Sequence, residues 1–448
     1  MGVFKAYDVR GIYPTDINEE LAYKVGKAYV EFLRAKKLLV GMDMRNSSYS
    51  LASSLMRGIT EMGCDVEYLD LVTTPMTYFA TEMYNADGAI MVTASHNPKE
   101  YNGLKFSREH AIPVGKDSGL QDVEALVIKN DFKLAETLGK IVRKDISKDY
   151  QRFILSHVNL KKRLKIVVDT SNGMVGHIFN SIFKGVEQLE IVELHFELDG
   201  NFPNHEANPI TDSNYRDLRL VMSAINADFG VMFDGDGDRV GFIDHKGRII
   251  PSDIITAILS DYLLTDDVVN KEVVYDVRSS RVLEEVILAK GGVPTLNKVG
   301  HAYMKKTLRD HDAFFGGELA GHFYFKEFFY ADSAVFAFVK MINLLSNDFI
   351  SLKDLSSKYM KYFPSGEINF RVKDAQDVLE KITQELKKDE DATLNFIDGV
   401  RADYPDYWIS IRKSNTEPLL RLVVEATTSD ISKKITQKYT DLIKELDK

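Results

Sequence analysis

The chain has 448 residues, and its 57 Lys and Arg against 67 Asp and Glu give a formal net charge of −10. Apolar residues make up 44% and charged residues 28%, the usual balance of a globular protein. The acidic excess argues against a nucleic-acid binder, because phosphate backbones attract basic proteins. No run of about 18 apolar residues predicts a membrane span, and the N-terminus lacks the apolar core of a signal peptide. The single cysteine, Cys64, excludes an intramolecular disulfide. We therefore expect a cytoplasmic protein of roughly three domains.

One element type recurs along the first three quarters of the chain. The apolar spacing of Glu19–Arg34 predicts an amphipathic helix. The short apolar run Leu38–Val40 follows and ends in a polar loop, as a buried strand would. The same pattern returns at Lys165–Val168 and at Glu272–Tyr275, each time before a helix-like stretch. These segments predict strand–loop–helix units.

A second element recurs in the same order. The segments are Asp87–Val92, Asp228–Phe233 and Asp312–Phe315, which lead into loops at Thr93, Asp234 and Gly316. Three weakly similar strand–loop–helix–strand–loop copies predict three α/β domains. Polar loops at the carboxyl ends of such strands are where α/β proteins bind ligands.

After about Pro364 the pattern changes. A half-exposed strand, a helix, three strands and a closing helix are predicted at Glu367–Val372, Asp374–Lys388, Thr393–Ile397, Trp408–Arg412, Leu419–Glu425 and Ser429–Lys448. This order is typical of an antiparallel sheet with two helices, an α+β module. We therefore place domain boundaries at 1–148, 149–250, 251–362 and 363–448.

The loop Thr93–Pro98 (TASHNP) carries the first candidate chemistry. Ser95 after a buried strand is placed as a nucleophile or phosphate carrier, and the Asn97-Pro98 turn would hold it exposed. An ordinary polar turn is the alternative. A Ser-His-Asp hydrolase is disfavoured, because the Ser95 and His96 side chains would point apart in an extended segment and no Gly-x-Ser-x-Gly elbow is present.

The loop Asp234–Arg239 (DGDGDR) carries the second set of candidate functional residues. Its three carboxylates alternate with glycines and can turn onto one cation, and hard oxygen ligands suit Mg²⁺ or Ca²⁺. Without a cation their repulsion would be costly. An EF-hand is excluded, because its sixth position is Arg239 rather than Gly and its twelfth is His245 rather than Glu. A solvated acidic turn is the alternative. Arg239 adds a charge that can hold a phosphate in bidentate fashion.

Two further loops carry weaker signals. In Gly316–His322, Glu318 and His322 offer the hydroxyl-binding groups that a sugar needs, although a plain glycine-rich turn fits as well. In Arg412–Pro418, with Arg421 beyond, a basic residue, hydroxyls and an amide can cradle a phosphate, unless this is only a surface turn. Because each of the four loops belongs to a different predicted domain, we expect one cleft built by four domains.

These four loops, in this order and after the opening Tyr7-Asp8-Val9-Arg10-Gly11, resemble the α-D-phosphohexomutases of the phosphomannomutase/phosphoglucomutase type. The resemblance covers essentially the whole chain, and the serine and aspartate loops are its most specific parts. It implies three similar mixed α/β domains, plus a C-terminal α+β domain similar to the TATA-binding protein, around a central cleft.

The resemblance also implies a mechanism. Ser95 carries a phosphoryl group, and Mg²⁺ binds Asp234, Asp236, Asp238 and a phosphoserine oxygen. A hexose 1-phosphate accepts the phosphoryl group at O6, giving a hexose 1,6-bisphosphate that serves as intermediate and activator. The C1 phosphate then returns to Ser95 and leaves the 6-phosphate. The metal and Arg239 neutralise charge on the transferring group.

By the same resemblance, Lys105 and His301 are candidates for proton transfer, with phosphate pairing and positioning as their alternatives, and His96 belongs to the catalytic loop. Glu318 and His322 would read the sugar. The remaining assignments are a phosphate group formed by Arg412, Ser414, Asn415, Thr416 and Arg421, and other cleft residues Tyr7, Arg10 and Arg278.

Substrate preference is less clearly indicated. The family's sugar loop usually has Ser where this chain has Ala320, and one lost hydroxyl contact costs about 0.5–1.5 kcal/mol. Mannose phosphate is the first expectation by analogy, glucose phosphate the second, and phosphoglucosamine mutase the alternative. An aspartyl-phosphate phosphatase is disfavoured, because Gly237 stands where that class has Thr or Val. Intact site loops disfavour a non-catalytic sugar-phosphate sensor. We expect hexose phosphates as partners, no nucleic acid, no membrane, and a monomer or homodimer.

Overall fold

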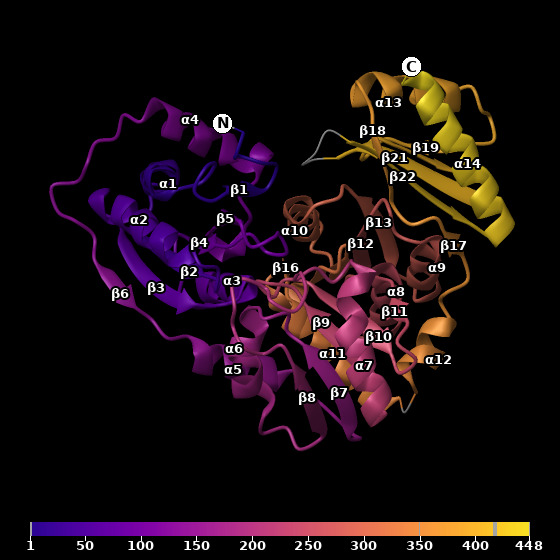
Figure 1. Ribbon diagram of the computed structural model, residues 1–448, viewed down its shortest axis with the longest axis horizontal. Helices are drawn as coiled ribbons and strands as arrows, with labels where there is room; N and C mark the ends of the chain where they lie inside the picture. The colour runs from indigo at the N-terminus through magenta and orange to yellow at the C-terminus, as the bar shows by residue number, and fades with distance from the viewer. Residues whose placement is uncertain (1, 349, 415–418, 448) are drawn as a thin grey trace. The chain divides into compact units, whose positions relative to one another are not determined.

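The computed structural model describes residues 2–348, 350–414 and 419–447 (Figure 1). The chain divides into two compact units. The first unit comprises Met1–Ser252 and Ala320–Leu355, and the second comprises Asp253–Leu319 and Ser356–Lys448. In the described part of the chain, no helix combines the length and apolar character that a membrane crossing requires.

The first unit opens with a mixed sheet in the order β1-β5-β4-β2-β3-β6. β2 runs parallel to β3 and β4, while β5 is antiparallel to β1 and β4. Its strands are β1 (Asp8–Ile12), β2 (Lys37–Met42), β3 (Asp65–Leu71), β4 (Gly88–Val92), β5 (Tyr101–Arg108) and β6 (Ile141–Arg143). Its helices are α1 (Glu19–Leu33), α2 (Ser48–Glu61), α3 (Thr74–Met83) and α4 (Leu120–Lys129), as Figure 1 shows.

A second sheet in the same unit repeats this plan in the order β11-β10-β9-β7-β8. β7 lies between two parallel partners, β8 and β9, and β9 is antiparallel to β10. The strands are β7 (Leu164–Asp169), β8 (Leu189–Leu194), β9 (Phe229–Phe233), β10 (Val240–Asp244) and β11 (Ile249–Ile250). The helices are α5 (Ser147–Ser156), α6 (Met174–Phe183) and α7 (Arg216–Ile225).

The third copy of the plan begins in the second unit, where β12 (Glu272–Asp276) runs parallel to β13 (Val293–Asn297) and β14 (Phe315–Gly317). Its helices are α8 (Ser252–Leu263), α9 (Arg281–Ala289) and α10 (His301–Asp310). The first unit adds β15 (Phe323–Phe325), β16 (Ala331–Asp332) and the buried α11 (Ala334–Asn347), and α12 (Leu352–Ser357) follows. The predicted repeat is confirmed: each copy has one strand flanked by two parallel neighbours.

One boundary of the third copy differs from the sequence expectation. The predicted strand Asp312–Phe315 was to end before Gly316, but β14 runs through both glycines. A Cβ at Gly317 would lie 2.1 Å from Thr256 Oγ1, and one at Gly316 would lie 2.8 Å from the Val274 carbonyl. The glycines are therefore strand residues that allow close packing against neighbouring elements.

The C-terminal module is antiparallel, as predicted, with strand order β17-β22-β21-β20-β19 and β18 beside β22. Both of its helices contribute to one apolar core on the sheet. The strands are β17 (Phe363–Pro364), β18 (Ile368–Arg371), β19 (Thr393–Asn395), β20 (Val400–Asp403), β21 (Tyr407–Lys413) and β22 (Leu419–Ala426), and the helices are α13 (Ala375–Leu386) and α14 (Ser429–Leu446) (Figure 1).

The sequence reading missed β20. A charged residue, Arg401, interrupts its apolar pattern, yet only 4% of that residue is exposed. Its guanidinium lies 4.0 Å from the Trp408 ring centroid and pairs with Asp403 at 3.0 Å. Stacking and pairing of this kind let an arginine occupy a buried strand position.

The packing of α1 on α2 depends on two facing glycines and yields a stability prediction. A Cβ at Gly58 would lie 2.1 Å from the Tyr23 carbonyl oxygen, and one at Gly26 would lie 2.4 Å from the Leu55 carbonyl oxygen. Overpacking in Gly58→Ala should therefore cost about 1–3 kcal/mol. The gain in helix propensity offsets about 0.8–1 kcal/mol of this, so we expect the free energy of unfolding to fall by up to about 2 kcal/mol.

Thermal unfolding of the purified chain measures this effect as a lower midpoint. Gly185→Ala is the matched control, because nothing in the described structure lies within 4 Å of a Cβ at that position. An unchanged or higher midpoint for Gly58→Ala would show that the two helices can move apart without loss.

Candidate active site

Ser95 lies just beyond β4, in a buried and conformationally restricted loop. Its residue is 1% exposed and its φ is 52°, in the left-handed region that non-glycine residues seldom adopt. The Ser95 N–H donates to Thr93 Oγ1 at 2.8 Å, and the Ser95 Oγ donates to Asp234 Oδ2 at 2.8 Å. The serine and aspartate loops are thus in direct contact.

Two sequence expectations about this loop are wrong. The turn at Asn97 was expected to hold Ser95 exposed, but the aspartate loop covers it. Ser95 and His96 were expected to point apart, but the left-handed backbone at Ser95 places its Oγ 3.3 Å from His96 Nδ1. Burial, followed by the charges of Arg239 and Arg10, lowers the pKa of His96 well below its usual range, so the ring is neutral.

A buried arginine holds the serine loop in place. Arg45 Nη1 donates to the carbonyls of Pro98 and Tyr101 at 2.7 and 2.9 Å, and Nη2 donates to those of Ser95 and Asn97 at 2.8 and 2.6 Å. Its Nε lies 3.2 Å from Asp43 Oδ2, with both side chains 0% exposed. The guanidinium therefore fixes the loop through four carbonyl oxygens at once.

The aspartate loop follows β9 and turns its three carboxylates inward. Asp234, Asp236 and Asp238 are at most 1% exposed. Asp234 Oδ1 accepts the N–H of Gly237 at 2.9 Å and that of Arg239 at 3.2 Å. Burial, followed by repulsion from Asp238 and Asp236, raises the pKa of Asp234 well above its usual range.

These carboxylates fit a divalent cation. One ligand atom from each of the three lies within 4.8 Å of the others. Asp236 Oδ1 is buried and has no hydrogen-bond partner among the described residues, which is an unfavourable position for a carboxylate oxygen. An all-oxygen donor set of this kind is suited to Mg²⁺.

Lys105 supplies the nearest positive charge. Its Nζ donates to Asp236 Oδ2 at 2.7 Å and to Asp238 Oδ2 at 2.5 Å. Burial favours the neutral amine, but Asp236 and Asp238 raise the pKa of Lys105 above its usual value. In this arrangement the side chain is a cation paired with two carboxylates.

Arg239 and His322 meet next to this loop, within the first unit. Arg239 Nε donates to His322 Nε2 at 3.1 Å, and that nitrogen lies 3.4 Å from Asp238 Oδ1. An isolated β-bridge also joins the two residues. The predicted sugar-binding His322 is thus connected to the aspartate loop.

Arg10, on β1, reaches the serine loop by donating to Asn97 Oδ1 at 2.7 Å, and the predicted cleft residue Tyr7 lies just before β1.

The second unit gathers three arginines around one carboxylate. Arg412 Nη2 donates to Glu367 Oε2 at 2.7 Å, and Arg421 Nη1 donates to Oε1 at 3.0 Å. Arg278 Nη1 lies 3.7 Å from Glu367 Oε2 and is itself oriented by Asp276. Burial alone would raise the pKa of Glu367, but the three arginines hold it below its usual range.

Two other predicted residues of the second unit, His301 and Glu318, lie at the start of a helix. His301 is the first residue of α10, and the Gly300 N–H before it donates to Glu318 Oε1 at 2.7 Å. Glu318 is 1% exposed. Ser414 directly follows β21, whereas Asn415 and Thr416 lie outside the described residues.

Sequence reasoning missed three residues that hold the candidate site. Arg45 and Glu367 are described above, and Thr74 at the start of α3 donates from its Oγ1 to Asp236 Oδ2. For Arg45 a signal was present, because Asp43 and Arg45 follow a buried strand. Thr74 and Glu367 gave none, since their partners are distant in sequence.

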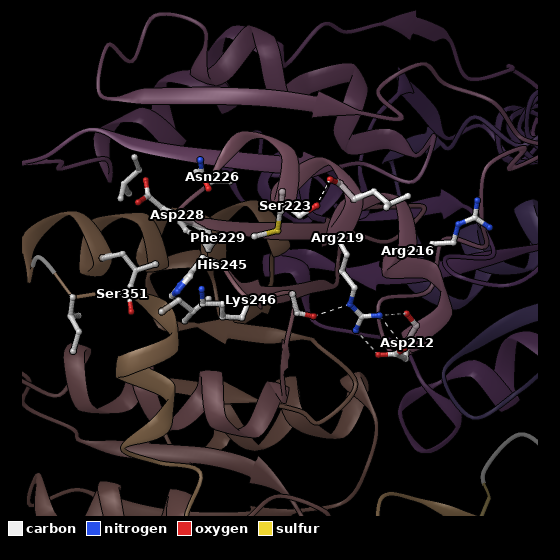
Figure 2. Close-up of a pocket in the computed structure, with 18 of the residues that line it drawn as sticks. Asp212, Arg216, Arg219, Ser223, Asn226, Asp228, Phe229, His245, Lys246 and Ser351 are labelled. Carbon is white, nitrogen blue, oxygen red and sulfur yellow. Dashed lines mark hydrogen bonds and ion pairs between the residues drawn. The ribbon is translucent and has the colours of Figure 1, made fainter.

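A cavity of about 1190 Å³ lies elsewhere in the first unit (Figure 2). Among the residues that line it, Arg219 pairs with Asp212, as the dashed lines in Figure 2 mark. Arg219 Nη2 lies 2.6 Å from Asp212 Oδ1. The cavity is lined by Asp228 and Phe229, at the amino end of β9, whereas Asp234 follows its carboxyl end. A five-residue strand separates the two ends by about 16 Å. The cavity is therefore distinct from the candidate active site.

Comparison with known proteins matches the whole domain series. The chain matches the models of phosphoglucomutase/phosphomannomutase alpha/beta/alpha domains I, II and III at residues 1–134, 148–247 and 251–363. It matches the C-terminal domain of the same family at residues 367–442.

Relatives and solved structures agree with this match. The phosphomannomutase of Vibrio cholerae is 36% identical over 99% of this chain and 98% of that protein. A phosphoglucomutase/phosphomannomutase family protein of Burkholderia thailandensis superposes with a TM-score of 0.91 at 30% identity, covering 99% of this chain and 97% of that one.

A more distant structure shares the fold. The N-acetylphosphoglucosamine mutase of Aspergillus fumigatus, solved in complex with GlcNAc-6P and magnesium, has a TM-score of 0.65 at 13% identity and covers 100% of this chain and 96% of that one. Together the four matched domains, the repeated mixed sheets and the full-length relatives show that the chain belongs to the phosphoglucomutase/phosphomannomutase family of phosphohexomutases, which are isomerases.

Proposed function

We propose that this enzyme interconverts mannose 1-phosphate and mannose 6-phosphate, and also the corresponding glucose phosphates, by way of a phosphorylated Ser95. The observation that carries the proposal is the 2.8 Å hydrogen bond from Ser95 Oγ to Asp234 Oδ2, which joins the candidate nucleophile to the cation-binding carboxylates. The names of full-length relatives, such as the phosphomannomutase of Vibrio cholerae, support mannose as the main sugar.

We assign the metal to Asp234, Asp236 and Asp238. Bound there, Mg²⁺ would supply positive charge that stabilises the transferring phosphoryl group. The magnesium in the Aspergillus fumigatus relative supports this choice of ion. Arg239, 14% exposed and beside Asp238, is placed to add a second positive charge.

The reaction follows from these roles. The sugar O6 forms a bond to phosphorus as the bond from phosphorus to Ser95 Oγ breaks, and the hydroxyl proton leaves O6. The resulting hexose 1,6-bisphosphate returns its C1 phosphate to Ser95. We assign Lys105 a charge-neutralising role, because its carboxylate partners keep it protonated. We therefore assign the proton transfer to His301, the first residue of α10.

The three arginines of the second unit suit the phosphate that does not react. Glu367 is an anion held by Arg412 and Arg421 through both of its oxygens, which shows that these side chains converge on an oxyanion. We propose that Arg278, Arg412 and Arg421, with Ser414, Asn415 and Thr416, bind this phosphate, and that Glu318 and His322 bind sugar hydroxyls. The hexose phosphate bound by the Aspergillus fumigatus relative supports this substrate class.

Phosphorylation of Ser95 is the first test. Intact-mass measurement of the purified chain, incubated with glucose 1,6-bisphosphate, should show one added phosphoryl group. Ser95→Ala should remove that mass and lower kcat by a factor of at least about 10³, because the covalent step is lost. Ser107→Ala is the matched control, since Ser107, on β5, is buried as Ser95 is. Full mutase activity in Ser95→Ala would refute the mechanism, and no activity in the wild type would favour a sugar-phosphate sensor.

Positioning by Arg45 is the second test. Arg45→Lys keeps the charge but cannot donate to four carbonyls, so the serine loop should lose its fixed geometry. We expect kcat to fall about 10–100-fold while KM for the hexose phosphate changes little, because substrate contacts remain. Arg152→Lys, with a side chain 79% exposed, is the control. A change in KM alone would assign Arg45 to substrate binding instead.

Ala320 gives the third test. Ala320→Ser restores the hydroxyl usual in the family, and one gained hydrogen bond of about 0.5–1.5 kcal/mol corresponds to a roughly 2–13-fold higher kcat/KM. Measuring kcat/KM on mannose, glucose and glucosamine 1-phosphates in both forms separates the substrates. A wild type most active on glucosamine 1-phosphate would establish the alternative, phosphoglucosamine mutase.

A further inference from the structure

A second cluster of potential metal ligands lies in the first unit, apart from the aspartate loop. It consists of Asp169 at the end of β7, His195 directly after β8, and His205 in the following loop. His205 Nε2 lies 2.9 Å from Asp169 Oδ2, and His195 Nδ1 lies 3.2 Å from Asp169 Oδ1. The side chains are 0%, 11% and 9% exposed in that chain order, so the cluster is enclosed but reachable.

The hydrogen bonds of His205 call for a positive charge at its Nε2. Its Nδ1 lies 2.9 Å from the Glu206 carbonyl oxygen, which can only accept, so Nδ1 carries the hydrogen. A neutral ring then presents the lone pair of Nε2 to the carboxylate of Asp169. That contact is repulsive unless a cation or a second proton lies at Nε2.

His195 lies between two carboxylates. Its Nδ1 faces Asp169, and its other nitrogen, Nε2, faces Asp217 Oδ2 at 3.8 Å. Ligating histidines commonly direct their second nitrogen at a carboxylate or a carbonyl, which orients the ring. Asp217 has this place beside His195, and the Glu206 carbonyl has it beside His205.

We propose that Asp169, His195 and His205 bind one divalent transition-metal ion of the Zn²⁺ type. Neighbouring ligand atoms around such an ion, at bond lengths of about 2.0–2.1 Å, are roughly 3.3 Å apart. The Asp169 oxygens lie 2.9–3.3 Å from the two ring nitrogens, and one ligand atom of each side chain lies within 4.8 Å of the others. Two imidazoles with one carboxylate favour Zn²⁺, whereas the all-oxygen aspartate loop favours Mg²⁺. With both rings as neutral ligands, the carboxylate of Asp169 is the negative charge that the ion would balance, because Asp217 already has Arg216 Nε 3.5 Å from its Oδ1.

The ion would stabilise the loop after β7 and would take no part in the reaction. Asp169 Oδ1 also accepts the Ser171 N–H at 2.8 Å, and Ser171 Oγ donates to the Phe233 carbonyl at 2.6 Å, one residue before Asp234. The Met174 N–H donates to the Gly235 carbonyl at 2.9 Å. The loop after β7 therefore carries the cluster on one side and supports the aspartate loop on the other.

Metal content is the direct test. The full chain is stripped with a chelator, returned to millimolar Mg²⁺ to saturate the aspartate loop, given excess Zn²⁺ and passed over gel filtration. We expect one zinc per chain by elemental analysis, a higher thermal midpoint, and d–d absorption bands when Co²⁺ replaces zinc. A wild type that emerges without zinc overturns the proposal and leaves a protonated His205 as the ion-pair partner of Asp169.

Variants locate the ion. His195→Gln and His205→Gln should each lose the zinc, while Asp217→Asn should weaken its binding about 10–100-fold, as loss of a supporting carboxylate does. Asp236→Asn and His110→Gln are controls that should retain it, the first on the aspartate loop and the second an exposed ring beside Glu82. Circular dichroism checks that each variant is folded. If both histidine variants unfold, the test of the proposal is whether Asp217→Asn binds zinc more weakly than the wild type. Zinc binding unchanged in Asp217→Asn and in the folded histidine variants, or lost in Asp236→Asn, overturns the assignment.

Discussion

The candidate site depends on one electrostatic constraint, the concentration of three buried carboxylates in a single loop. Asp234, Asp236 and Asp238 are almost fully enclosed, and Lys105 offers one positive charge against their three. Burial and mutual repulsion therefore disfavour the ionised form of Asp234. This repulsion is relieved if one carboxyl takes a proton or if a divalent cation binds. Asp236 Oδ1 is buried without a hydrogen-bond partner among the described residues, which a bound cation explains and a proton on another carboxyl does not.

The backbone around this loop is shaped to bring the serine to the same place. A Cβ at Gly235 would lie 2.5 Å from the Ser95 carbonyl oxygen, so the two loops touch through their main chains and a glycine is required there. On the other side, a Cβ at Gly173 would lie 2.9 Å from the Gly235 carbonyl oxygen. Ser95 accepts a left-handed backbone, normally unfavourable by about 1–3 kcal/mol, because its own N–H donates to Thr93 Oγ1 and its own carbonyl accepts from Arg45. The left-handed backbone of Ser95 therefore depends on the hydrogen bonds from Arg45 and to Thr93.

What sequence reasoning found and missed follows from the range of each interaction. The aspartate loop and the serine loop were recognisable because their chemistry is local, within six consecutive residues each. The strand repeat was recognisable because apolar runs and their following loops recur in order. Arg45 contacts carbonyls about fifty residues away, and Thr74 contacts Asp236. Glu367 contacts Arg412 and Arg421. These pairs are far apart in the chain, so no residue spacing predicts them. The burial of Ser95 escaped prediction for the same reason, since the covering residue, Asp234, comes from another repeat.

The acidic net charge of −10 is consistent with an enzyme for anionic sugars, because local charge and total charge are set by different residues. Three of the acids converge where a cation fits, and the cation that we propose there would make them part of an anion-binding surface. In the second unit, Glu367 neutralises part of the charge of Arg278, Arg412 and Arg421, which would otherwise repel one another. A phosphate carries more negative charge than a carboxylate and can accept the same bidentate hydrogen bonds, so it competes favourably for those guanidinium groups. An internal carboxylate therefore keeps the arginines assembled and leaves them open to the phosphate that we propose they bind.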